Sequence, residues 1–91
     1  MDGRENLLER RRIVSLMLLA AEQAPRLVEV CASVSGDESS ARRVLAEAFG
    51  VSEMDAQFIL DMQVRRFTPP AIERTRSELA DIDSQLDGRN P

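Results

Sequence analysis

Helix-breaking residues constrain this chain more than any other feature, because they divide a sequence of strong helix formers into short segments. Pro25 ends a first helix, predicted over about 6–23, since proline lacks a backbone N–H and restricts the residue before it. Proline is tolerated in a first helical turn, so a second, short helix is predicted to begin there. After a turn at 35–37, Asp37 can cap a third helix over 38–49.

Further breaks define the second half of the chain. Gly50 stands where the glycine of a helix C-terminus is expected. Ser52 can then cap a fourth helix, whose apolar residues continue as far as Phe67. Thr68 followed by two prolines combines an N-cap with first-turn residues, and it predicts a fifth helix over about 69–86.

These segments predict an all-α fold with a single domain over residues 1–91. Only 3% of the residues are aromatic, and glycine and proline number four each, which suits helices joined by short connections. The terminal helices, about 6–23 and 69–86, are the longest, and we expect them to pair as an antiparallel two-helix coiled-coil stalk. Three short helices within about 25–67 would form a knob at its far end. The apolar residues of the last helix follow the spacing of a coiled-coil seam: Ile72, Leu79, Ile82 and Leu86.

The residue types that are missing exclude several classes of active site. The chain has no His, Lys, Tyr or Trp, and all 12 basic residues are arginine. It therefore lacks the usual general base, the commonest metal ligand, a Schiff-base amine and a phenolic nucleophile. Its one cysteine, Cys31, cannot form an internal disulfide, and its apolar neighbours predict that it is buried. We predict no catalytic residue, no cofactor and no metal.

Charge and hydropathy favour a cytoplasmic protein that does not associate with membranes. The net charge of -4 is spread evenly, so no segment forms a basic arm, and tight nucleic-acid binding is not expected. Three arginines precede the largely apolar stretch 13–21, which gives some likeness to a signal peptide. The acidic residues before those arginines favour a buried helix instead, and the stretch is too short to span a bilayer.

Two patterns near the end of the sequence suggest other chemistry. Three aspartates within 81–87 are spaced like part of a Ca²⁺-binding loop, but Gln85 and Leu86 occupy positions that need an Asp or Asn and a Gly. The stretch 79–86 is similar to the opening of the helical chorismate mutases, yet no helices follow that could supply the rest of such an active site. A solvated helix face is the simpler interpretation of both patterns.

The stretch 51–67, VSEMDAQFILDMQVRRF, carries a resemblance to a known family. It is similar to the pattern Leu-Ser-Glu-x-Gln-Ala-x-Ala-Ile-Leu-Asp-Met-x-Leu-x-x-Leu in the A subunit of bacterial type IIA topoisomerases, which are DNA gyrase and topoisomerase IV. Residues 10–34 resemble that family's descending coiled-coil helix with its kink, and residues 41–50 resemble the next short helix. Residues 72–86 resemble the ascending helix. The likeness covers about nine-tenths of the chain and departs at 68–70.

In that family the segment is a coiled coil with a small helical domain at its tip, where two copies meet as the exit gate for a transported DNA duplex. The resemblance therefore implies a homodimerising gate module. It implies no catalysis, because the family's DNA-cleaving tyrosine lies on another domain and this chain has no Tyr.

Surplus apolar residues on the fourth helix indicate the partner surface. We predict that the dimer or partner interface includes Met54, Phe58 and Met62; at Phe58 the family usually has a smaller residue. Arg10, Arg11 and Arg12 are candidates for contact with a DNA backbone, although ion pairing within the domain is the favoured role.

Three roles remain open at this point. The chain could be a stand-alone homodimer, a regulator that binds the gate of a full-length topoisomerase A subunit, or a separate piece that needs its DNA-cleaving domain in trans.

Overall fold

The computed structural model describes residues 3–88, and all of its regular secondary structure in this range is helical. The elements are α1 (Gly3–Glu22), α2 (Ala24–Ala32), α3 (Glu38–Phe49), α4 (Glu53–Leu60), the short 3-10 helix η1 (Val64–Phe67) and α5 (Pro69–Leu86). The all-α class is therefore confirmed.

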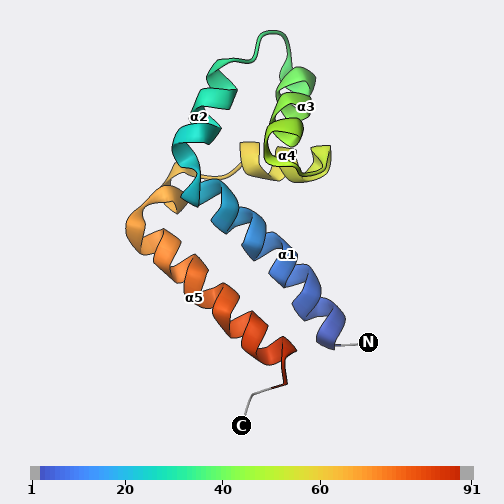
Figure 1. Ribbon diagram of the computed structural model, residues 1–91, viewed down its shortest axis with the longest axis vertical. Coiled ribbons are helices and arrows are strands. Elements are labelled where there is room, and N and C mark those ends of the chain that lie inside the picture. Colours follow the sequence, from blue (N-terminus) through green and yellow to red (C-terminus); the bar gives the residue numbers. More distant parts are fainter. Residues whose placement is uncertain (1–2, 89–91) are drawn as a thin grey trace.

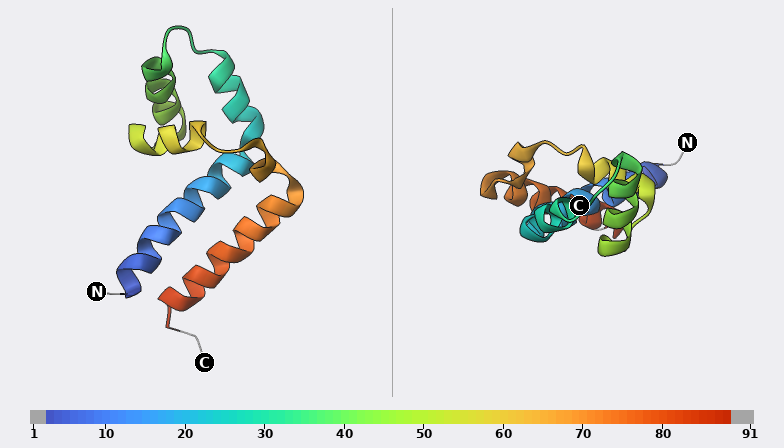
Figure 2. Two further views of the ribbon diagram at one scale, coloured as in Figure 1. Left: turned by 180° about the vertical axis from the view of Figure 1, so that it is seen from behind. Right: turned by 90° about the horizontal axis from the view of Figure 1, so that it is seen from above.

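The two long helices, α1 and α5, lie side by side and run antiparallel (Figure 1). Helices α2 and α3 stand beyond one end of this pair, and α4 crosses at the foot of α3, as the view from behind also shows (Figure 2). The molecule measures 51 × 30 × 17 Å and has a radius of gyration of 14.8 Å. A compact domain of this length would have a radius of about 12 Å, so the chain is elongated. Whether the α1–α5 pair is a coiled-coil stalk stays a prediction.

Capping residues set the helix boundaries. Three helices begin at a side-chain oxygen that accepts a hydrogen bond from the backbone N–H three residues further on, at distances of 3.0 to 3.4 Å: Asp37, Ser52 and Thr68. Gly50 ends α3 with a φ of 68°, in the left-handed region that glycine enters without steric cost. Each of these boundaries agrees with the sequence prediction.

Helices α1 and α4 differ from the prediction. Helix α1 begins at Gly3, before the expected start near residue 6. Helix α4 ends at Leu60 and does not continue to Phe67, because residues 61–63 turn the chain into η1. This turn lets Met62 and Phe67 pack against the same core that α4 covers. An uninterrupted helix would carry Phe67 about 10 Å beyond Leu60, away from that core.

The core has two parts that share α1. One cluster joins α1 to the three short helices and contains Leu16, Ala20, Leu27, Leu45, Ala46, Ala56 and Ile59. The buried residues outside this cluster all belong to α1 and α5: Val14, Ala21, Ala71, Thr75 and Ile82. Helix α1 is thus covered on more than one side, as its nearly all-round apolar second half predicts.

The prediction that Cys31 is buried is wrong, because the residue is exposed. Only one side of α2 is covered: Leu27 is 6% exposed and contributes to the core, whereas Val28 is 65% exposed. The broad apolar stripe of α2 suggested deeper burial than a nine-residue helix at the edge of the molecule receives.

Candidate interaction surface

Of the three predicted partner residues, two are exposed to solvent and the third packs against the core. Met54 is 79% exposed and Phe58 is 37% exposed. They lie on one face of α4, because residues four positions apart are neighbours on a helix. We call this pair the α4 face. Met62 lies after the end of α4 and is half-buried, with its side chain packed against the core.

Phe58 and Met62 nevertheless line one shallow pocket of about 310 Å³, between the end of α4 and α1. Met17 of α1 contributes to the same pocket. The structure therefore brings Phe58 together with both of its predicted companions, with Met54 along the helix and with Met62 across the pocket. Whether this surface binds a partner stays a prediction.

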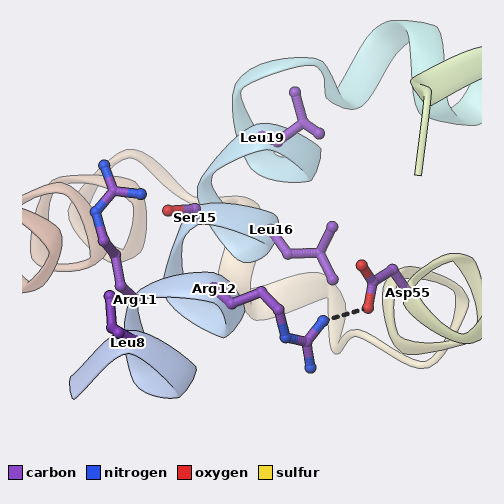
Figure 3. A pocket seen from close by; sticks show the side chains of 7 residues that line it. All are labelled: Leu8, Arg11, Arg12, Ser15, Leu16, Leu19 and Asp55. Atoms are coloured by element: carbon purple, nitrogen blue, oxygen red, sulfur yellow. Dashed lines mark hydrogen bonds and ion pairs between the residues drawn. The ribbon is translucent and has the colours of Figure 1, made fainter. Parts of the chain in front are cut away.

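Helix α4 is held against α1 by an ion pair. The Nη1 of Arg12 lies 2.5 Å from Oδ1 of Asp55, and Arg12 also pairs with Glu9 at 2.9 Å. Figure 3 shows Arg12 and Leu16 pointing from α1 toward Asp55, over a pocket of about 390 Å³, whereas Ser15 points to the other side of the helix. The hydrogen bond from Arg12 holds the pKa of the Glu9 carboxyl below its usual range. These contacts orient the α4 face relative to the α1–α5 pair.

The other two arginines of the triplet link α1 to α5. Arg10 pairs with Glu78, and Arg11 pairs with Asp83 at 2.5 Å. Exposed ion pairs of this kind contribute little to stability, so their main effect is to set the alignment of the two helices. The structure thus gives all three arginines the ion-pairing role, and contact with a DNA backbone stays a prediction.

Three exposed apolar residues were not predicted: Leu8 at 47%, Val28 at 65% and Val64 at 79%. Val28 borders a pocket of about 190 Å³ whose other walls include Leu60 and Phe67, and the exposed Cys31 lies at the same place. The sequence assigned Val64 to a face of a longer fourth helix. Its exposure follows from the turn at 61–63, which the apolar spacing does not reveal.

Within residues 3–88, no group of three or more acidic or cysteine side chains is placed to hold a metal ion. No helix in that range has both the length and the apolar character needed to cross a membrane.

Comparison with known proteins identifies a distant similarity. Over 82 residues the chain is 29% identical to the DNA gyrase A subunit of Metamycoplasma arthritidis (strain 158L3-1). The match covers 90% of this chain and 9% of the gyrase polypeptide, so the chain spans a small part of its relative. No protein-family profile and no solved structure matches the chain.

The similarity supports a distant relationship to a small part of the A subunit of DNA gyrase. It reaches into both long helices and includes the short helices between them, because it covers nine-tenths of the chain.

Proposed function

We propose that this chain is a non-catalytic helical module that forms a symmetric homodimer through the α4 face, as the exit gate of a topoisomerase A subunit does. The observation that carries the proposal is the exposure of Met54 and Phe58, two large apolar side chains on one face of an eight-residue helix. A contiguous apolar face on a small domain usually marks a partner surface.

The total surface of the chain supports this proposal. Its accessible area is 6144 Å², whereas a compact monomer of 10.2 kDa would expose about 5,300 Å². The excess of about 800 Å² equals the area that each partner buries in an interface of standard size. An elongated monomer with this excess has enough surface to form a stable dimer.

A second copy of the chain is the binding partner that suits the α4 face best. In a two-fold symmetric interface the same patch meets itself, so the patch must tolerate its own copy. Met54 and Phe58 are uncharged, and the thioether chain of methionine adapts to irregular neighbours and packs well against aromatic rings. Self-pairing of these two side chains therefore places no charge at the centre of the interface.

The sequence supports the absence of catalysis in the proposed module. No Tyr is present anywhere in the 91 residues, so the family's covalent attack on DNA has no nucleophile here. We expect the purified chain to leave a supercoiled plasmid unchanged, and relaxation of the plasmid would contradict this part of the proposal.

Cys31 supplies the probe for the experiment that tests the dimer. It is the only cysteine of the chain and it is exposed, so a spin label attaches there alone. In a symmetric dimer the two labels give one defined distance by double electron–electron resonance. We expect this distance distribution in the wild-type chain and its loss in the double variant M54S/F58S.

The matched control is L8S, because Leu8 is 47% exposed and also apolar but lies on α1, outside the α4 face. This control should retain the inter-label distance. The proposal is overturned if the spin-labelled wild-type chain, without dilution by unlabelled chain, shows no inter-label distance. It is also overturned if M54S/F58S shows the same distance as the wild type.

A second role is favoured by the nature of the similarity. Because the relative is a much longer polypeptide of which this chain matches 9%, the corresponding segment of a gyrase A subunit is an alternative partner for the same face. Purified chain should then inhibit supercoiling and co-sediment with the gyrase polypeptide, and M54S/F58S should do neither. If wild-type chain in excess neither binds that polypeptide nor changes supercoiling, this role is excluded.

A further inference from the structure

Most arginines of this acidic protein are engaged inside the domain. Seven of those within residues 3–88 donate to a carboxylate, a carbonyl, an amide or a hydroxyl oxygen: Arg4, Arg10, Arg11, Arg12, Arg26, Arg42 and Arg76. Within the same residues, the side chains of four arginines make no hydrogen bond or ion pair: Arg43, Arg65, Arg66 and Arg74. The distribution of these four over the surface is uneven.

Three of the four unpaired arginines line one pocket. Arg65 and Arg66 of η1 and Arg74 of α5 border a hollow of about 390 Å³, together with Thr68 and Ala71. The pocket lies where η1 turns into α5, and all three arginines are exposed. A net charge of -4 makes three unpaired cations in one hollow a distinct local feature of this surface.

Two acidic side chains near this pocket accept hydrogen bonds from other residues. Asp61 accepts hydrogen bonds from the side-chain amide of Gln57 at 3.1 and 3.2 Å. Glu73, which precedes Arg74 in α5, pairs with Arg76 at 2.9 Å. None of these carboxylates makes an ion pair with the three arginines, although Asp61 shares a neighbouring hollow with Arg66 and Asp81 shares one with Arg74.

The positive end of helix α5 contributes no free donor to the site. Its first two residues are prolines, which have no N–H, and the N–H of Ala71 donates to the hydroxyl of Thr68. Only the guanidinium groups can bind an anion here. Each is permanently charged and presents its donors in a planar fork that matches the oxygens of a phosphate group.

We propose that Arg65, Arg66 and Arg74 form a binding site for a phosphate group, either that of a small phosphorylated anion or that of a nucleic-acid backbone. Charge-assisted, two-pronged hydrogen bonds to phosphate oxygens are among the strongest polar contacts that a surface can make. Binding would also relieve the mutual repulsion of the three cations. Neither Met54 nor Phe58 borders this pocket, although Arg66 also lines the hollow beside Phe58, and the chemistry of the site does not require a dimer.

The test titrates the full chain with two probes at low ionic strength, inorganic pyrophosphate and a DNA duplex of about 20 base pairs. Binding is followed by calorimetry and by the Nε–H resonances of the arginines. The variant is R74Q, and the matched control is R43Q, because Arg43 on α3 is also exposed and unpaired but does not border the pocket. We expect R74Q to weaken binding about three- to tenfold and R43Q to change it less than about twofold.

The two probes distinguish the two sources of phosphate. Pyrophosphate binding that R74Q weakens assigns the site to small phosphorylated anions. Binding of the duplex alone assigns the site to a nucleic-acid backbone. In that case the logarithm of the binding constant falls linearly with the logarithm of the salt concentration, and R74Q should reduce the steepness of this line by about 0.9. The proposal is overturned if neither probe binds, or if R43Q weakens binding as much as R74Q. Repeating the titration on M54S/F58S, which should bind equally well, keeps this result separate from that of the proposed dimer.

Discussion

Replacing Ile59 with alanine tests whether one face of α4 is anchored in the core while the opposite face is exposed to solvent. Ile59 is 2% exposed and belongs to the cluster that joins α4 to α1 and the other short helices. Truncating a buried isoleucine to alanine costs about 2–5 kcal/mol, because transfer free energy is lost and a cavity remains. Alanine recovers less than about 0.5 kcal/mol of this through its better helix propensity. We therefore expect a loss of about 3 kcal/mol.

That loss is large for a domain of this length, whose total stability should be about 5–13 kcal/mol. It corresponds to a fall in Tm of about 15 °C. The assay is urea unfolding followed by far-UV circular dichroism, because the chain has no Trp or Tyr to report by fluorescence. All variants are compared at one chain concentration, since association with a second copy would add to the apparent stability.

The matched control is M54A, on the same helix but 79% exposed. Its stability at low concentration should stay within about 0.5 kcal/mol of wild type, because no buried contact is lost. At high chain concentration, where dimers form, the stability of M54A should rise less than that of the wild type, because the substitution weakens association through the α4 face. A cost below about 1 kcal/mol for I59A, or an equal cost for M54A, would refute the two-faced description of α4.

Three further predictions concern polar groups. Ser15→Ala should stabilise the chain by about 1 kcal/mol in urea unfolding, because the Ser15 hydroxyl is buried and has no hydrogen-bond partner within residues 3–88; a loss of stability would contradict this. Arg12→Gln should cost less than about 1 kcal/mol, because its ion pairs are exposed, and a double-mutant cycle with Asp55→Asn measures the coupling directly. The N–H of Ser40 lowers the pKa of Asp37, so the stability that this cap contributes is present above its ordinary pKa near 3.8 and is lost as the pH falls through the lowered value. Acid titration of D37N should show a smaller loss over that range, and an unchanged loss would contradict the assignment.

Local signals in the sequence predict most of the helix boundaries. Asp37, Ser52 and Thr68 were identified as caps because their short polar side chains can accept a backbone hydrogen bond, and each does so in the structure. Gly50 was identified from its position after an apolar stripe, and it adopts the left-handed conformation expected of a helix end. Such signals depend on a few neighbouring residues, so a single sequence contains them.

The features that the sequence misses depend on contacts between distant segments. The break after Leu60 follows no proline or glycine, and it serves to place Met62 and Phe67 on the core. The exposure of Cys31 depends on how far the other helices extend over α2. The unpaired state of the three pocket arginines could not be predicted either, because it depends on which acidic side chains the fold brings near them.

Sedimentation equilibrium of the wild-type chain tests the central claim most directly. The buffer should contain a reductant, because the exposed Cys31 could otherwise link two chains covalently. At chain concentrations of about 10–100 μM we predict a species of twice the 10.2 kDa chain mass, which the double variant M54S/F58S converts to monomer. A wild-type chain that sediments as a 10.2 kDa monomer throughout this range would contradict the account of a gate-like dimer.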